Sequence, residues 1–232
     1  MRVVFLGDSL TAGRPGVSYF RLLQQANTNR TLVNLGRGGD SVISLYRRLS
    51  RMPHACEADI AFVWIGLNDV FPRVSWTFPW VRRLLRHPWS RDRQTFESYY
   101  RRLLDLVSPK AHRVVAVAPL MLGERPENEW NRQLAALSES VCSIASEYAN
   151  VEYLDLRLYM PPHDSPPSGY VASRAICVLR DALLLKTPQR VDRVAARRGL
   201  SLTLDGAHLN SAGAAAVAAA FHRAMDATPA DR

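Results

Sequence analysis

The sequence predicts an α/β protein in which helices cover both faces of a parallel sheet of about five strands. Short apolar runs alternate along the chain with longer segments of helical periodicity, as in doubly wound folds. The 232 residues contain no repeat and no low-complexity linker, so we expect a single domain over residues 1–232. Hydrophobic residues make up 47% and charged residues 22%, a balance that excludes a disordered chain, a collagen-like fibre and a disulfide scaffold.

Five short runs rich in apolar residues are the expected strands. In chain order they cover residues 2–6, 31–35, 58–65, 113–118 and 151–156. The third run carries the strongest signal, because it is apolar without interruption from Ile60 to Ile65, as is typical of a parallel strand buried on both faces. Pro119 ends the fourth run, since proline cannot donate a hydrogen bond to a neighbouring strand.

Helical segments are expected between and after these strands. They cover about 17–27, 41–51, 94–107, 128–148 and 211–226. In the third of them Phe96, Tyr100 and Leu103 fall at helical spacing on one face, and Asn210 or Ser211 is a suitable N-cap for the last. Ligands of such sheets bind beyond the carboxyl ends of the strands, so the residues that follow each strand are the candidate site.

Cysteine usage and hydropathy bear on the compartment. Cys56, Cys142 and Cys177 are scattered and show no CxxC spacing, which favours reduced thiols over disulfides or a zinc site. The apolar run at the N-terminus is too short for a signal sequence, and no run reaches the roughly 18 apolar residues of a spanning helix. We expect a cytoplasmic protein without a transmembrane segment, unless a leader has been removed.

Positive charge is concentrated in one region of the chain. The net charge is +9, and residues 71–102 hold eight arginines against two acidic residues. The same window contains Trp76, Trp80 and Trp89, three of the five tryptophans. One interpretation is weak contact with an anionic membrane surface, and the simpler one is a solvated arginine face over packed aromatics. No nucleic-acid-binding motif is present, so no nucleic-acid partner is expected.

Polar motifs occupy the predicted strand ends and the start of the last helix. They are Gly7-Asp8-Ser9-Leu10, Gly38-Gly39-Asp40-Ser41, Gly66-Leu67-Asn68-Asp69 and Asp205-Gly206-Ala207-His208. A serine in a strand-to-helix turn is either an exposed nucleophile or a helix N-cap. Glycine N–H groups and a side-chain amide can stabilise an oxyanion, and histidine beside aspartate can act as a general base. Ser41 is a rival nucleophile to Ser9, although an N-cap role suits it better.

In this order, the motifs resemble those of the SGNH hydrolases, also called the GDSL esterase/lipase family. The resemblance covers residues 1–69 and about 200–226, and between them it extends only to the order of strands and helices. It implies a three-layer α/β/α fold with a flavodoxin-like sheet of about five parallel strands. It also implies that the chemistry needs no metal and no organic cofactor.

The resemblance assigns roles to individual residues. Ser9 would be the nucleophile of a catalytic triad, His208 its general base and Asp205 the group that orients His208. The oxyanion hole would consist of the backbone N–H groups of Ser9 and Gly39 and the side-chain amide of Asn68. The aspartates next to Ser9 and Asn68, at positions 8 and 69, would position the loops without reacting.

The implied activity is hydrolysis of carboxylic esters with short to medium acyl chains, through an acyl-serine intermediate. The same motifs occur in family members that act on lipids, thioesters and acetylated sugars, so the motifs do not select the substrate. A carbohydrate O-deacetylase is the first alternative, since the tryptophans of residues 71–102 could stack on sugar rings. A catalytically silent binding protein is the second, but such a protein has no physical need for all the reactive residues.

Two segments depart from the family pattern, residues 70–93 and 156–204, and we expect both near the active-site mouth. In the first, one helical face would carry Trp80, Val81, Leu84 and Leu85, and another Arg82, Arg83 and Arg86. In the second, a proline-rich loop precedes a helix whose apolar face would comprise Val171, Ala175, Val178, Leu179, Ala182 and Leu183. We interpret these segments as a lid or acyl-binding wall in which Trp76, Trp80 and Leu84 contact substrate. The alternatives are an extension of the core and a homodimer contact.

Overall fold

The computed structural model describes residues 1–74, 77–84, 86–161, 169–172 and 175–227. Five strands form one fully parallel sheet in the order β2-β1-β3-β4-β5. The strands are β1 (Arg2–Gly7), β2 (Thr31–Gly36), β3 (Ala58–Trp64), β4 (Ala111–Val117) and β5 (Val151–Leu154). This strand order is that of flavodoxin-like sheets and confirms the predicted fold class. The order reverses between β1 and β3, so the carboxyl ends of these two strands are where a ligand site is expected.

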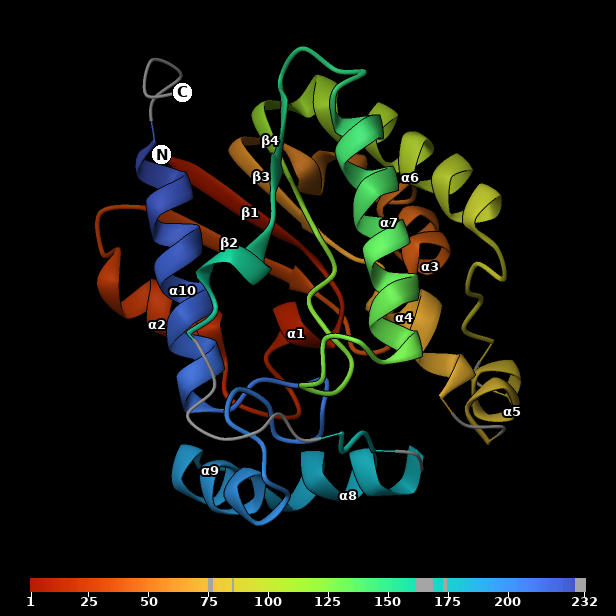
Figure 1. Cartoon of the computed structure of the whole chain (residues 1–232). Helices are drawn as coiled ribbons and strands as arrows, with labels where there is room; N and C mark the ends of the chain where they lie inside the picture. Colours follow the sequence, from red (N-terminus) through yellow and green to blue (C-terminus); the bar gives the residue numbers. More distant parts are fainter. Residues whose placement is uncertain (75–76, 85, 162–168, 173–174, 228–232) are drawn as a thin grey trace.

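Helices cover both faces of the sheet, as Figure 1 shows. One face carries α2 (Tyr19–Ala26) and α10 (Ser211–Asp226), which pack against each other. The other face carries α3 (Val42–Leu49), α6 (Arg93–Val107) and α7 (Glu129–Ala145). These five correspond to the predicted helices, and their arrangement gives the three layers of an α/β/α fold.

Five further helices complete the helical structure of the described chain. They are α1 (Ser9–Ala12), α4 (Leu67–Val70), α5 (Thr77–Leu84), α8 (Ala175–Leu184) and α9 (Pro188–Arg197). Figure 1 shows α8 and α9 below the carboxyl edge of the sheet, and α5 and α8 are in contact. Single 3₁₀ turns complete the chain at Pro53–Cys56, Phe71–Arg73, Ser108–Lys110 and Leu156–Tyr159. No helix in the described part of the chain is both long and apolar enough to cross a membrane.

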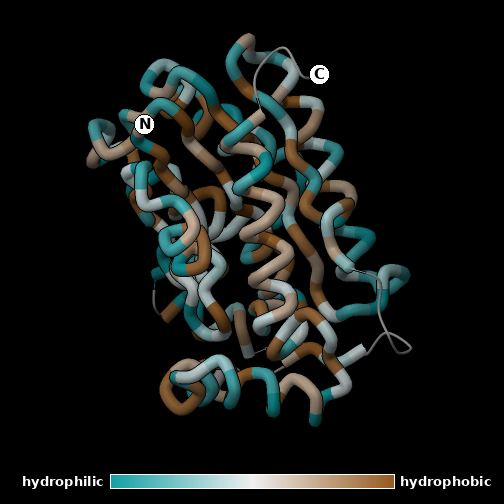
Figure 2. The backbone as a smooth tube through the Cα atoms, turned by 90° about the vertical axis from the view of Figure 1, so that its left-hand side faces the viewer, coloured by the Kyte–Doolittle hydropathy of each residue, from teal (hydrophilic) through white to brown (hydrophobic). Residues whose placement is uncertain are grey.

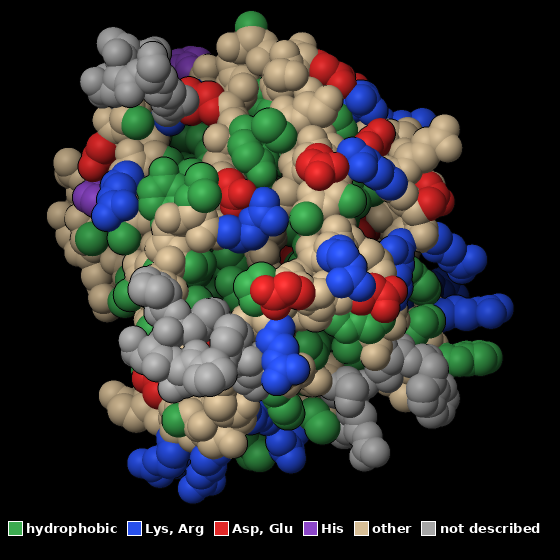
Figure 3. All heavy atoms as spheres, viewed as in Figure 1, with side chains coloured by type: hydrophobic (Ala, Val, Ile, Leu, Met, Phe, Trp, Pro, Cys, Tyr) green, Lys and Arg blue, Asp and Glu red, His purple; other side chains and the backbone are tan. Residues whose placement is uncertain are grey.

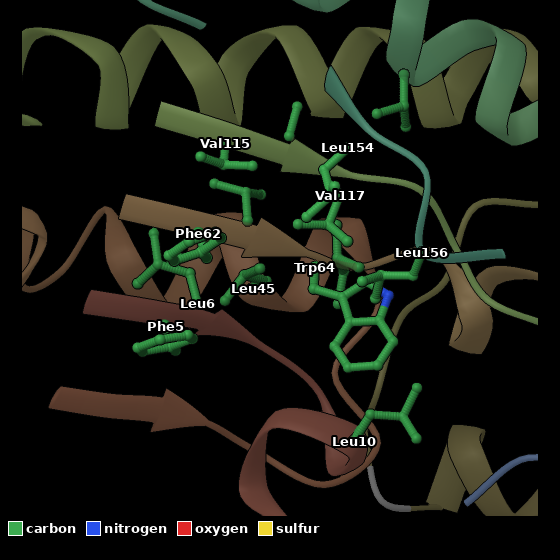
Figure 4. Packing of buried hydrophobic residues seen from close by; sticks show 14 of the residues in the cluster. Phe5, Leu6, Leu10, Leu45, Phe62, Trp64, Val115, Val117, Leu154 and Leu156 are labelled. Atoms are coloured by element: carbon green, nitrogen blue, oxygen red, sulfur yellow. The ribbon is translucent and has the colours of Figure 1, made fainter. Parts of the chain in front are cut away.

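The core lies between the sheet and its two helical layers. Figure 2 shows the hydrophobic residues concentrated in the central strands and the inner sides of the helices. On the side of α2 and α10, the rings of Phe5 and Phe62 stack with centroids 5.0 Å apart, and Phe221 of α10 packs edge-on against both. Such ring pairs stabilise a core beyond the area they bury. Figure 4 shows Phe5, Phe62 and Trp64 along the strands, with Trp64 at the end nearest the site.

The side chains of α5 are not distributed as predicted, because an arginine is buried and two apolar side chains are exposed. Trp80 is 67% exposed and Leu84 83% exposed, whereas Arg82 is only 7% exposed. Residues two positions apart lie about 200° apart around a helix, so drawing Arg82 inward turns both apolar side chains outward. The inward pull is electrostatic, because the carboxylates of Asp8, Asp40 and Asp69 surround the guanidinium. Two residues of this prediction, at positions 76 and 85, lie outside the described residues.

The apolar face predicted for the second segment is also wrong in part. Leu179 and Leu183 are exposed, and Asp181 faces inward with 3% exposure. The cause is an ion pair, because Asp181 Oδ2 lies 2.7 Å from an Nη atom of Arg198. Burying a carboxylate without a partner costs more free energy than leaving two leucine side chains exposed to solvent. The predicted Val178 does pack against the core, whereas the side chain of residue 175 lies outside the described set.

The junction of β2 with α1 leaves no room for a side chain. A Cβ atom at Gly36 would collide with the backbone of Thr11 and Ala12, whereas one at Gly38 would meet nothing within 4 Å. We therefore expect Gly36→Ala to lower the free energy of unfolding by roughly 1–3 kcal/mol, measured by urea denaturation. Gly38→Ala is the matched control and should change it by less than about 0.5 kcal/mol. Equal effects of both substitutions would contradict this account of the junction.

Candidate active site

Three side chains from opposite ends of the chain form a continuous hydrogen-bonded relay. Ser9 follows β1 directly, and its Oγ lies 2.9 Å from Nε2 of His208. His208 Nδ1 lies 2.8 Å from Oδ2 of Asp205. All three are buried, with exposures of 7%, 5% and 0%. The arrangement places a hydroxyl, an imidazole and a carboxylate in the order that lets a base remove the serine proton.

The protonation of this relay follows from burial and charge together. Burial disfavours the imidazolium, but the charge of Asp205 and its hydrogen bond favour it more, so the pKa of His208 lies above its ordinary value. Burial likewise acts to raise the pKa of Asp205, but the nearby imidazole and two backbone N–H groups lower it below the usual range. Asp205 therefore stays ionised, and the His208 proton sits on Nδ1 when the ring is neutral.

The loop that carries Asp205 and His208 is held by a buried carboxylate that the sequence did not reveal. Glu124 lies between β4 and α7 and is 2% exposed. Its Oε2 accepts a 2.7 Å hydrogen bond from the N–H of Ser201, and its Oε1 accepts 2.8 Å bonds from the N–H groups of Leu202 and Thr203 and from the Thr203 hydroxyl. These bonds fix the backbone just before Asp205.

The long second segment contributes two more contacts to the same loop. Arg198, at the end of α9, donates to the carbonyl of Leu204 at 2.9 Å, and its other Nη is held by Asp181 of α8. The N–H of Ala172 donates to the carbonyl of Asp205 at 2.9 Å. Gly206 has φ +86°, and a Cβ there would collide with the carbonyl of Tyr170. The segment thus packs directly against the residues that carry the relay.

The amide of Asn68 is fixed next to the serine turn. Its Nδ2 donates to Asp8 Oδ2 at 3.1 Å, while Asp8 Oδ1 accepts from the N–H of Leu10 at 2.9 Å. Asp8 therefore joins the turn after β1 to the turn after β3. Complete burial raises the pKa of Asp8 to about 7, against the lowering effect of the N–H of Leu10 and the charge of His208. One amide hydrogen of Asn68 remains for another acceptor.

A second aspartate organises the neighbouring loops. Asp69 Oδ2 accepts a hydrogen bond from the N–H of Val42 at 3.0 Å. Its Oδ1 accepts from the N–H and the hydroxyl of Ser90, at 2.9 and 2.8 Å. Ser41, the rival nucleophile, caps α3 and donates its hydroxyl to the carbonyl of Pro88 at 2.5 Å. It has no contact with His208, so its environment is that of a helix cap.

The remaining predicted site residues lie farther from the relay. Gly39 has φ +79°, a conformation that favours glycine, and the ring of His87 lies over it, with Nδ1 3.1 Å from the position of a Cβ. No direct contact joins Gly39 to Ser9. Of the predicted substrate contacts, Trp80 and Leu84 are largely exposed, and Trp76 lies outside the described residues.

Sequence reasoning missed two residues of this region besides Glu124. Arg82 donates to the Asn68 Oδ1 atom at 3.5 Å and to the carbonyl of Pro88 at 3.2 Å. Burial lowers the pKa of its guanidinium, and the surrounding carboxylates partly restore it. Arg198 was noted only as part of a basic stretch. An arginine among many others carries no signal of burial, so neither could be singled out from the sequence.

Comparisons with known proteins agree with this architecture. The acetylxylan esterase Axe2 from Geobacillus stearothermophilus superposes with a TM-score of 0.67 at 21% identity, over 98% of this chain and 94% of that one. An alpha/beta hydrolase enzyme from the metagenome of Lake Arreo, Spain, gives 0.66 at 19%, over 97% and 94%. The acetyl xylan esterase AlAXEase gives 0.61 at 18%, over 97% and 99%. At these identities the likeness shows the fold alone.

Sequence comparison identifies the family. No curated protein sequence gives a significant match to this chain. A model of the GDSL-like lipase/acylhydrolase family matches residues 5–216, which is nearly the whole chain and includes every residue of the relay. The match supports an ester-cleaving hydrolase and leaves lipids and acetylated carbohydrates both open as substrates. This chain belongs to the GDSL-like lipase/acylhydrolase family.

Proposed function

We propose that this protein is a serine esterase that hydrolyses short-chain carboxylic esters through an acyl-serine intermediate. The observation that carries the proposal is the relay of Ser9, His208 and Asp205, with distances of 2.9 and 2.8 Å between successive groups. Membership of the GDSL-like lipase/acylhydrolase family supports the same reaction class.

The relay supplies each proton that the reaction needs. Ser9 Oγ attacks the acyl carbon while its proton passes to Nε2 of His208, and the carbonyl oxygen becomes an oxyanion. The free amide hydrogen of Asn68 and the N–H groups of Ser9 and Gly39 are the donors we assign to that oxyanion. When the intermediate collapses, the alkoxide leaves with the proton from His208. Water then gives a proton to His208 and attacks the acyl group. When this second intermediate collapses, the bond to Ser9 Oγ breaks, His208 returns the proton to Oγ, and the acid is released.

A second candidate is removal of acetyl groups from carbohydrates, a reaction within the same class. Two structures with the same fold are named as acetylxylan esterases, which favours this reading. The exposed ring of Trp80 is available to stack on a sugar, as the tryptophans of carbohydrate sites do. Lipase activity has no comparable support, and we place acetyl esters ahead of long-chain ones.

We also propose that the described parts of residues 70–93 and 156–204 form fixed walls of the site. Arg82 of α5 reaches Asn68, and Arg198 at the end of α9 reaches the backbone before Asp205. Hydrogen bonds of this kind tie both segments to the reacting residues. A lid that opens and closes would have to break them.

Removing the nucleophile is the direct test. We expect Ser9→Ala to reduce kcat on p-nitrophenyl acetate by roughly 10⁶-fold, because no other hydroxyl among the described residues bonds to His208. Ser41→Ala is the matched control and should retain activity, since Ser41 caps α3. A series of p-nitrophenyl esters from acetate to palmitate, run beside acetylated xylooligosaccharides, ranks the two candidates. Activity that survives Ser9→Ala would refute the assignment.

The raised pKa of His208 predicts the pH dependence. Only neutral His208 can accept the Ser9 proton, so kcat/KM should rise with pH through the pKa of His208, with a midpoint above its ordinary value of 6.5. Asp205→Asn removes the charge that raises this pKa, so the midpoint should move to lower pH. The maximal kcat should fall by roughly 10⁴-fold, because the ring loses the partner that fixes its tautomer. An unmoved midpoint would contradict the assigned role.

The loop support by Glu124 predicts a defect without loss of a reacting group. Glu124→Gln replaces an oxygen that accepts backbone N–H groups by an amide that repels them. We expect kcat to fall at least roughly tenfold with KM little changed, and the free energy of unfolding to fall by about 1.5–3 kcal/mol. Glu127→Gln, in the same loop but exposed, is the control. Full activity of Glu124→Gln in steady-state assays would exclude the positioning role.

A further inference from the structure

Around α5 and the loop that follows it lies a pocket of about 440 Å³ whose walls are dominated by positive charge. Five arginines contribute to it: Arg47, Arg82, Arg83, Arg86 and Arg91. Trp80, Trp89 and His87 form much of the rest, and none of the described lining residues is acidic. We call it the arginine pocket. Figure 3 shows Lys and Arg side chains projecting together with hydrophobic ones along the lower right edge, where Figure 1 places α5.

The arginines of this pocket are not used in ion pairs with the protein itself. Elsewhere on the surface arginines pair with carboxylates, as Arg101 does with Glu147 at 2.8 Å. Among the described residues, no carboxylate lies within salt-bridge distance of the five pocket arginines. Asp8, Asp40 and Asp69 offset part of the charge of Arg82. The other four arginines are exposed and have no carboxylate partner among the described residues, so together they attract an anion.

Arg82 lines the pocket and is buried, and one of its N–H groups has no acceptor among the described residues. The side chain is 7% exposed, and its two Nη groups bond to Asn68 and Pro88. Its Nε–H is buried and has no partner. Buried N–H groups are nearly always paired, so this donor lacks an acceptor that the described residues do not supply.

Arg86, just after α5, has a backbone conformation that favours glycine. The N–H of Arg86 donates to the carbonyl of Arg83 at 3.1 Å, and that of His87 donates to the carbonyl of Arg82 at 2.8 Å. Arg86 has φ +53°, the left-handed conformation that ends many helices and usually falls to glycine. The side chain of Arg86 does not stabilise the helix end and instead lines the pocket.

The pocket borders both loops to which we assign oxyanion donors. Arg82 bonds to the amide of Asn68, and the ring of His87 lies over Gly39. Burial, together with the charges of Arg82 and Arg37, lowers the pKa of His87, so this ring is neutral near pH 7. Arg82 and His87 thus connect the pocket to the loops that carry Asn68 and Gly39.

From these observations we propose that the arginine pocket binds an oxyanion group, such as a carboxylate, carried by the ester substrate itself. Guanidinium groups match carboxylate and phosphate geometry with paired N–H donors. The inference rests on the proposed esterase function and narrows it to anionic esters. The shared chemistry is an oxyanion, and a free inorganic anion is the competing source.

Matched ester pairs separate charge from shape. The first pair is 4-acetoxybenzoate and its methyl ester, in which a methoxycarbonyl group replaces a carboxylate on the alcohol side. The second pair is mono-p-nitrophenyl glutarate and its methyl ester, in which the same replacement is made on the acyl side. The readout is the ratio of kcat/KM for the charged member to that for the neutral member. A general loss of activity in a variant cancels from this ratio.

We expect the ratio to exceed 10 for at least one pair in the wild type at low salt. Arg83→Gln/Arg86→Gln should lower it about tenfold. The control Arg193→Gln/Arg197→Gln removes the same charge from exposed positions of α9 and should leave it unchanged. Arg86→Gly should lower the ratio while the melting temperature stays equal or rises, since glycine adopts φ +53° without strain.

The contrary results are distinct. Ratios near 1 for both pairs would overturn the inference while leaving the esterase proposal intact. A preference for charged esters that the α9 control also loses would overturn it as well, because long-range charge would then explain the preference. Competitive inhibition by inorganic phosphate, lost in the pocket variant but without preference for charged esters, would assign the pocket to a free anion. Failure of the wild type to cleave even the neutral esters would refute the esterase function itself.

Discussion

The carboxylate of Asp205 is the group on which the rest of the site depends. It has no exposure to solvent, yet its pKa lies below the usual range, because it accepts from His208 Nδ1 and from the N–H groups of Ala207 and His208. A buried negative charge of this kind fixes the tautomer of the imidazole and raises its pKa. Nε2 of His208 can accept the proton of Ser9 Oγ only because the Asp205 carboxylate stays ionised and holds the ring proton on Nδ1.

A buried charge requires surroundings that do not move. Here the surroundings are polar rather than apolar, since Glu124 holds the backbone before Asp205 on one side and Arg198 holds the carbonyl of Leu204 on the other. On the far side of the serine, Asp8 and Arg82 hold the two ends of the Asn68 amide. The two segments that depart from the family pattern thus reach the site through hydrogen bonds, and only secondarily through packing.

The fold and the grouping of Ser9 with His208 and Asp205 could be predicted from the sequence because their signals are local. An apolar run such as Ile60–Ile65 forms a strand wherever it is buried, and parallel strands bring Ser9 and Asn68 to the same edge whatever the intervening chain does. The orientation of α5 could not be predicted, because it depends on three aspartates of which two, Asp8 and Asp40, lie far away in the chain. Glu124 gave no signal at all, since its partners are backbone N–H groups and the hydroxyl of Thr203, 79 positions away.

The relay also spans nearly the whole chain, because Ser9 and His208 are 199 positions apart. The base is followed at once by α10, whose Phe221 completes the aromatic cluster over Phe5 and Phe62. During synthesis Ser9 is made long before His208, so a chain that has not yet reached His208 carries a serine without the imidazole that contacts it in the fold. The helix that follows His208 also supplies Phe221 to the aromatic cluster, so the same stretch of chain completes both the relay and this part of the core.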